Sequence, residues 1–436
     1  EILASNDSLR EADGSKPDWI ELYNQSGTEL DLGDHSLTDS LADPRRRVLP
    51  AGTTIPAFGY RRFRCDGGAP SSVTNTGFGL KANGGAVYLF DKSTNNSALL
   101  DSVAYGIQVP DLSIGRIPNG TGTWTLTIPS PASVNLALSL GNVSVLKVNE
   151  WMASPASGDD WFEIYNPGSD FIALGGLRLS DDLTTAGLVK YPPIPALSFI
   201  GVQTNACLRF WADGNPSAGA DHVKFKLSTA GEGIAIATAV GVPIDGVSFG
   251  PQSLGVSEGR FPDGSVTMVT FPGTDSPGES NYRLLTSVVI NEVLTHTDPP
   301  LEDAIELRNL TGDSVNVGGW FLSDAKGSLR KYRIPDGTVI PVASYVVFYE
   351  YQFNVDPLNN SLAFALSSAK GDEVYLSSTD SGGALTGYRA SVKFGAAENG
   401  VSFGRYLNSV SNEHFVAMSA RMFGVDDPAT TNQFRT

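Results

Sequence analysis

The stretch DWIELYN at residues 18–24 decides the fold, because the chain repeats it as DWFEIYN at 160–166 and as DAIELRN at 303–309. Apolar and polar residues alternate within it, which is the pattern of a half-buried β-strand. The copies start at residues 18, 160 and 303, so the interval between them is nearly constant. This interval is too long for a solenoid repeat and suits an independent domain. The sequence therefore predicts three copies of one β-module.

Other segments recur around this strand in a constant order. Gly 47, Pro 26 and only 18% charged residues favour short strands joined by tight turns. We predict an all-β chain with seven to nine antiparallel strands in each copy, arranged as a two-sheet sandwich. The recurring segments are a short strand with an acidic end, at SLTD (36–39), RLSD (178–181) and FLSD (321–324), and later S-x-G-R, which ends at Arg116, Arg260 and Arg405.

The constant order sets the expected domain boundaries. We predict domains at 1–142, 143–285 and 286–436, joined by short linkers that allow limited flexing. The second and third copies open with an apolar strand that ends at Glu150 or Glu292, whereas the first copy starts at the matching Glu1. The opening strand of the first copy is therefore expected to be incomplete, with a sheet edge that invites another strand.

Charge and hydropathy exclude two classes of partner. The formal charge of −17 argues against nucleic acid, which binds basic surfaces. No apolar run approaches the ~20 residues that a membrane helix needs, so no membrane insertion is expected. The opening residues EILASNDS have neither the basic nor the apolar region of a signal peptide.

The two cysteines occupy matching places in two copies. Cys65 follows Gly59 at the same separation at which Cys207 follows Gly201. Matching positions in separate domains lie in separate cores, beyond the ~7 Å limit between α-carbons for a disulfide. We predict that Cys65 and Cys207 are not bonded to each other.

Taken together, these segments resemble the lamin-tail domain family in its bacterial extracellular form. The pattern adds an opening V-x-I-N-E, present as LKVNE (146–150) and VVINE (288–292), and a closing S-P-x-x-x-N, present as SPASVN (130–135). The third copy departs from it by placing Ala304 where the strand has Trp. The resemblance implies an immunoglobulin-like β-sandwich and an occurrence in large secreted or surface proteins. No heptad pattern accompanies it, so the chain is not expected to be an intermediate filament protein.

A recurring acid and a recurring arginine are the first candidates for chemistry. A carboxylate and an arginine can mark a catalytic site, but a partly buried carboxylate also needs a partner that a bidentate arginine supplies. We predict structural ion pairs, one in each copy, between Glu21 and Arg116, Glu163 and Arg260, and Glu306 and Arg405.

The first copy also carries an acidic loop around Gly14. Hard oxygen ligands near a glycine turn suit Ca²⁺, although the spacing of the common calcium loop is missing. The alternative is a solvated acidic loop. The candidate ligands are Asp7, Glu11, Asp13 and Asp18, and no other cofactor is expected.

The histidines give no support to catalysis. They are at unrelated positions in the module, and the chain carries no H-E-x-x-H, C-x-x-C pair, P-loop or G-x-S-x-G motif. We predict that the protein is not an enzyme, which would need convergent titratable residues in one module. The histidines are His35, His222, His296 and His414.

Two non-catalytic functions remain. The first is an extracellular structural or adhesive protein, a bacterial surface scaffold or filament component whose partners are other copies of itself or further modules, end to end or laterally. The alternative is a ligand- or carbohydrate-binding accessory region of a larger secreted enzyme. A fold of this kind hosts many functions, so the site must decide.

Overall fold

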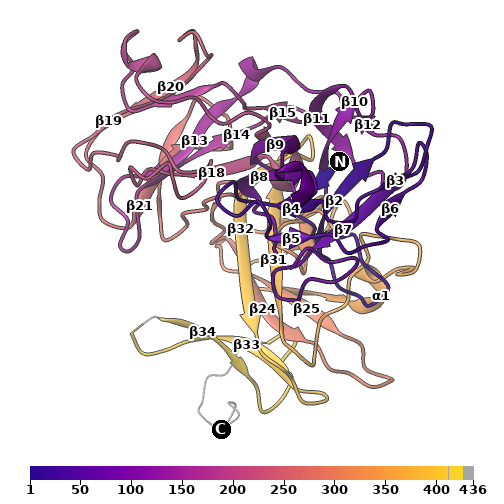
Figure 1. The fold of residues 1–436 in the computed structure, drawn as a ribbon. Helices are drawn as coiled ribbons and strands as arrows, with labels where there is room; N and C mark the ends of the chain where they lie inside the picture. Colours follow the sequence, from indigo (N-terminus) through magenta and orange to yellow (C-terminus); the bar gives the residue numbers. More distant parts are fainter. Residues whose placement is uncertain (411, 426–436) are drawn as a thin grey trace. The chain divides into compact units, whose positions relative to one another are not determined.

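The computed structural model describes residues 1–410 and 412–425, and β-strands make up nearly all of its regular structure (Figure 1). The predicted all-β class is confirmed. The chain divides into two compact units, Glu1–Glu279 and Ser280–Thr436. In the described part, no helix is long and apolar enough to cross a membrane. The helical segments there are short: α1 (Glu350–Phe353) and the 3-10 turns at Ser93–Asn95, Val143–Val145, Gly187–Val189 and Gln203–Asn205.

The first sheet pair belongs to the first unit and encloses its own apolar core. Ile20 on the repeated strand and Leu37 on the facing sheet are both buried there. The larger sheet has the order β12-β11-β10-β1-β2-β7, formed by β1 (Ile2–Leu3), β2 (Asp18–Tyr23), β7 (Tyr60–Cys65), β10 (Ser113–Ile117), β11 (Thr123–Ile128) and β12 (Leu136–Ala137). The facing sheet β5-β4-β8-β9 and the ribbon β3-β6 are formed by β3 (Leu30–Asp31), β4 (Ser36–Thr38), β5 (Arg47–Val48), β6 (Thr54–Ile55), β8 (Asn83–Phe90) and β9 (Leu99–Ile107).

The second sheet pair completes the first unit and repeats this arrangement. Its core contains Phe162 and Ile164 from the repeated strand. The larger sheet β18-β14-β13-β21-β22 is formed by β13 (Lys147–Met152), β14 (Trp161–Tyr165), β18 (Cys207–Trp211), β21 (Val256–Arg260) and β22 (Met268–Pro272). The sheet β16-β19-β20 and the ribbon β15-β17 are formed by β15 (Ile172–Ala173), β16 (Arg178–Ser180), β17 (Phe199–Ile200), β19 (Glu232–Ala237) and β20 (Pro243–Phe249).

The first two sheet pairs share direct bonds and packing. The backbone N–H of Gly106 donates to the carbonyl of Ala196 at 2.9 Å, and the N–H of Ile107 donates to the Ser198 hydroxyl at 3.1 Å. Phe199 of the second pair is buried in the core of the first pair. The backbone N–H groups that are buried between the two sheet pairs find their acceptors across the contact. The two sheet pairs therefore form one compact unit rather than beads joined only by a linker. The predicted boundary at 142 therefore lies inside this unit.

The third sheet pair forms the second unit. Ile305 and Leu307 of its repeated strand are fully buried in its core. One sheet has the order β30-β25-β24-β33-β34, formed by β24 (Val288–Leu294), β25 (Ala304–Asn309), β30 (Tyr345–Tyr349), β33 (Ser402–Leu407) and β34 (Glu413–Ala417). The sheet β23-β32-β31-β27-β28 and the ribbon β26-β29 are formed by β23 (Arg283–Leu284), β26 (Val315–Asn316), β27 (Phe321–Ser323), β28 (Tyr332–Arg333), β29 (Val339–Ile340), β31 (Asp372–Thr379) and β32 (Leu385–Phe394).

The two cysteines are free and buried, as predicted. Cys65 lies in the first core, and Cys207 starts the edge strand β18 of the second pair. Burial raises the pKa of both thiols, because a thiolate in an apolar core loses its hydration. Both thiols are therefore protonated packing groups rather than reactive ones.

Candidate functional site

Each sheet pair contains two glutamates that face each other on neighbouring strands. In the second pair, Glu150 on β13 lies opposite Glu163 on β14, and both side chains are fully buried. Glu292 and Glu306 take the same places in the third pair and are equally buried. In the first pair, the N–H of Glu21 donates to the carbonyl of Glu1 at 2.8 Å. The repeated glutamates therefore line up in all three pairs.

These carboxylates hold a loop that we call the closing loop, residues 130–132, 276–278 and 422–424. In the second pair, Glu150 accepts bonds from the hydroxyl and the N–H of Ser276, at 2.9 and 3.2 Å. Glu163 accepts from the N–H of Gly278 at 2.7 Å and from the Asn149 amide at 2.9 Å. Buried carboxylates need such donors, so this network has a structural role.

The same bonds recur in the other sheet pairs. Ser130 and Ala132 donate to Glu1 and Glu21 in the first pair. In the third pair the donors are the N–H groups of Met422 and Gly424. This closing loop has no Ser-Pro sequence. The segment of the third copy that resembles SPASVN is DPATTN (427–432), and those residues lie outside the described part of the chain. A backbone N–H can come from any residue type, so sequence reasoning could not find Met422.

Burial changes the protonation of the glutamate pairs. It raises the pKa of Glu150 and of Glu306 to about 7, and the pKa of Glu163 well above its usual range. The main cause is lost hydration, and the neighbouring carboxylate adds to it at Glu163. The glutamate pairs of the second and third sheet pairs can therefore hold a proton near neutral pH. Because Glu150 and Glu163 are fully buried, a substrate cannot reach them.

The predicted Glu–Arg ion pairs are wrong. Alternation puts Arg116 on the same face of β10 as the core residue Ile114, whereas Glu21 lies on the face of β2 opposite the core residue Ile20. The arginine therefore points between the sheets, and the glutamate points toward the closing loop. Among the described residues, the arginines bond to other acids: Arg116 to Asp101 at 2.6 Å, Arg260 to Asp245 at 2.9 Å, and Arg405 to Glu413 at 2.9 Å.

The Asp–Arg pairs had a sequence signal that was missed. Asp101 and Asp245 precede their arginines at the same separation, whereas Ala390 occupies that place in the third copy. In the second pair, the ion pair holds a peptide group of β13: the N–H of Val148 donates to Asp245 at 2.9 Å, and the Nε of Arg260 donates to the Val148 carbonyl at 2.8 Å.

The predicted calcium ligands do not converge. Glu11 pairs with Arg62 at 2.7 Å, and Asp13 pairs with Arg64 at 3.1 Å. Asp18 accepts from the backbone N–H of Asn6, and Asp7 lies near Asp111, which accepts its N–H. Over residues 1–410 and 412–425, no group of three or more His, Cys, Asp and Glu side chains could hold a metal ion. The acidic loop is instead tied to the arginines of β7.

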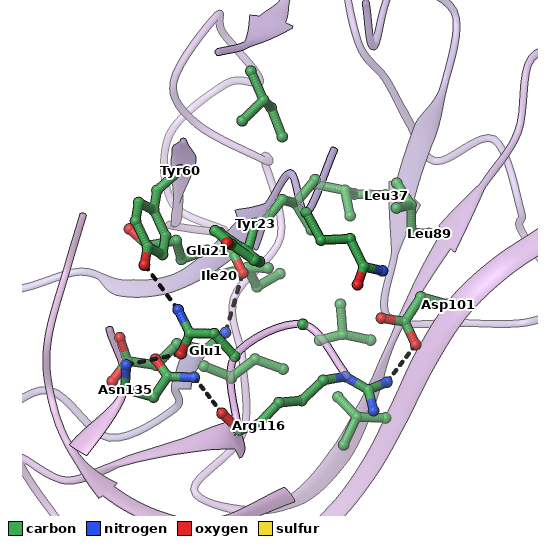
Figure 2. Close-up of a pocket in the computed structure, with 18 of the residues that line it drawn as sticks. Glu1, Ile20, Glu21, Tyr23, Leu37, Tyr60, Leu89, Asp101, Arg116 and Asn135 are labelled. Carbon is green, nitrogen blue, oxygen red and sulfur yellow. Dashed lines mark hydrogen bonds and ion pairs between the residues drawn. The ribbon is translucent and has the colours of Figure 1, made fainter. Parts of the chain in front are cut away.

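A cavity opens between the two sheets of the first pair, and Figure 2 shows it from close by. Its volume is about 160 Å³. The lining is apolar at the sheets and polar at the rim, where Arg116 extends to Asp101 and the Asn119 amide donates to the Tyr60 hydroxyl at 2.8 Å. The aliphatic lining residues are Ile2, Ile20, Leu22, Leu30, Leu32, Leu37, Ile55, Val87, Leu89 and Val103. This is the strongest candidate for a binding site.

The aromatic wall of this cavity supports its arginine. The guanidinium of Arg116 lies 4.9 Å from the ring centre of Trp124, within the range of a cation–π contact. Its Nη1 also donates to the carbonyl of Gly122 at 3.2 Å. The arginine is thus held in place at the cavity wall by Asp101, Gly122 and Trp124.

One protein-family model matches part of the chain. The lamin tail domain family model matches residues 4–106 and 285–392, which are in the first and third sheet pairs. Its immunoglobulin-like sandwich agrees with the observed sheets. The crystal structure of the S-layer protein SbsC, domains 7, 8 and 9, is 10% identical, covers 75% of this chain and 71% of its own, and has a TM-score of 0.15. That score carries no argument about fold or function. Curated proteins gave no match.

Proposed function

We propose that the protein is an extracellular structural or adhesive protein, built from three tandem immunoglobulin-like modules that act as a surface scaffold. The observation that supports this best is that the repeated glutamates bind groups inside the protein. Glu150, Glu163, Glu292 and Glu306 all hold closing loops inside the protein. What the chain repeats is thus the internal framework of the module, as a scaffold requires, and catalysis is not part of the proposal.

The shared surface between the first two sheet pairs supports the same proposal. Bonds such as that from Gly106 to Ala196 make Glu1–Glu279 one compact unit. Direct bonds between neighbouring modules resist bending, and a spacer needs this stiffness. We place the protein on the bacterial cell surface, with other copies or further modules of the same protein as its partners. The net charge of −17 disfavours nucleic acid.

The experiment is a localisation and assembly assay. Producing cells are labelled with antibody before and after protease treatment, and purified protein is followed by sedimentation and electron microscopy. We expect surface labelling that protease removes, and ordered multimers or binding to isolated cell walls. A purely cytosolic signal, or a monomer that binds no envelope fraction, would contradict the proposal.

A second candidate is a ligand-binding accessory region, and the cavity of the first sheet pair favours it. Small-molecule sites combine an apolar lining with a few convergent polar groups, as Leu37 and the Asp101–Arg116 pair do here. Thermal shift with a panel of soluble oligosaccharides tests this function. A stabilisation that Arg116→Met removes would support it, and no shift with any sugar would count against a carbohydrate ligand.

A further inference from the structure

The second unit buries an arginine whose side chain has no hydrogen-bond acceptor. Arg389 on β32 is 5% exposed. Its guanidinium carbon lies 3.7 Å from the ring centre of Tyr282 and 5.7 Å from that of Tyr375. Among the described residues, no oxygen atom accepts a hydrogen bond from this side chain. A buried cation normally has such an acceptor, because a buried charge without one is costly.

Ser377 lies directly across from Arg389 on the neighbouring strand. The two residues are a register pair of β31 and β32, which run side by side (Figure 1). Paired residues project from the same face of a sheet, and the core residue Leu376 takes the other face. The Ser377 hydroxyl is buried and, in the described part of the chain, has no hydrogen-bond partner. A guanidinium and a hydroxyl, both without an acceptor, therefore stand side by side on the face away from the core.

The carboxylate that β31 carries on that face is already engaged. Alternation puts Glu373 and Tyr375 on the same face as Ser377. Glu373 accepts from the Tyr375 hydroxyl and from Nζ of Lys393, the latter at 2.9 Å. The face thus supplies an acid to Lys393 and none to Arg389.

Neither polar residue belongs to the framework that the module repeats. The other two copies have an apolar residue at both places. The residues at the matching places are Phe90 and Ala237 for the serine, and Leu100 and Ile244 for the arginine. The sandwich therefore forms without these two polar groups, which favours a role in binding over a role in folding.

We propose that Arg389 and Ser377 form a binding site for a carboxylate group. Stacking on Tyr282 uses the face of the guanidinium and leaves its N–H edge, which matches the two oxygens of a carboxylate. The Ser377 hydroxyl donates a third bond to one of these oxygens. The site holds one unpaired positive charge, so a ligand with a single negative charge fits it better than a dianion. This site goes beyond the proposed function and does not depend on it.

The carboxylate is that of a small organic acid or of an acidic sugar, and acetate and glucuronate are the probes for these two sources. Each is added to the full chain at constant ionic strength, with chloride as the balancing anion, and binding is measured by saturation-transfer NMR on the ligand protons. We expect saturable binding. Sulfate should compete about tenfold more weakly, because its second charge has no partner. Tighter binding of glucuronate would identify an acidic sugar as the source, and equal or tighter binding of acetate a small organic acid.

Variants of the two donors test the contacts. Arg389→Met should weaken binding about tenfold or more and Ser377→Ala about threefold, the usual effects of losing a charged and a neutral hydrogen bond. Arg389→Lys keeps the charge without the planar fork and should also weaken binding. The matched control is Arg333→Met, which removes an exposed Arg–Asp pair in the same unit and should leave binding unchanged.

Circular dichroism and melting confirm that each variant folds, and if Arg389→Met does not, Arg389→Lys and Ser377→Ala decide the test. The proposal is overturned if neither acetate nor glucuronate binds saturably, or if the wild type and the variants of both donors bind equally. It is also overturned if sulfate competes as strongly as acetate. Surface localisation and assembly are measured separately, so either idea can fail alone.

Discussion

The buried pair Glu150–Glu163 predicts that the first unit loses stability as the pH rises from about 4.5 to about 7. Burial moves the pKa of Glu150 from its ordinary value of 4.5 to about 7. Between these values the folded state binds more protons than the unfolded state, so stability is complete below pH 4.5 and falls as the pH rises toward 7. At about 1.4 kcal/mol per pH unit, the loss is about 3 kcal/mol.

Glu150→Gln removes this ionisation while its amide oxygen can still accept the bonds of Ser257 and Ser276. The free energy of unfolding is measured by urea titration between pH 5 and 8 with tryptophan fluorescence, to which Trp151, Trp161 and Trp211 contribute from the second sheet pair. We expect the wild type to lose about 2.5 kcal/mol over this range, and the variant to lose much less.

The control is Asp336→Asn, since Asp336 is an exposed carboxylate in the other unit. It should leave the pH profile of the tryptophan signal unchanged. A wild-type profile that is flat from pH 5 to 8, or a slope that persists fully in Glu150→Gln, would refute the reasoning. Glu163 titrates together with Glu150, so the measured midpoint belongs to the pair.

Three further predictions concern a buried glutamate, the two cysteines and calcium. Glu163→Ala leaves the N–H of Gly278 without its acceptor and removes one acceptor of the buried Asn149 amide, and it should lower the free energy of unfolding by about 3 kcal/mol in urea titrations, whereas a loss under about 1 kcal/mol would contradict the network. Cys65 and Cys207 should react with a thiol reagent only after denaturation, because both are buried and their pKa values are raised; rapid labelling of the native protein would disprove this. Removing calcium with a chelator should leave the melting temperature unchanged, and a fall of several degrees would restore the calcium hypothesis.

The all-β class and the repeated strand were predictable from the sequence. Period-two alternation in DWIELYN is a local property, so the placement of Ile20 and Glu21 on opposite faces of the strand follows from it. The resemblance to lamin-tail domains was found from the same segments, and the family model matches the first and third copies. The burial of both cysteines in separate sheet pairs also followed from their spacing.

The partners of the repeated charged residues were decided by the tertiary structure. The sequence shows that Glu163 and Arg260 recur together, but only the sheets show that one faces the closing loop and the other faces Asp245. The contact between the first two sheet pairs likewise depends on distant groups, such as the Gly106 N–H and the Ala196 carbonyl. Local alternation determines the face on which a side chain lies, whereas its partner depends on which distant strand or backbone N–H packs against that face.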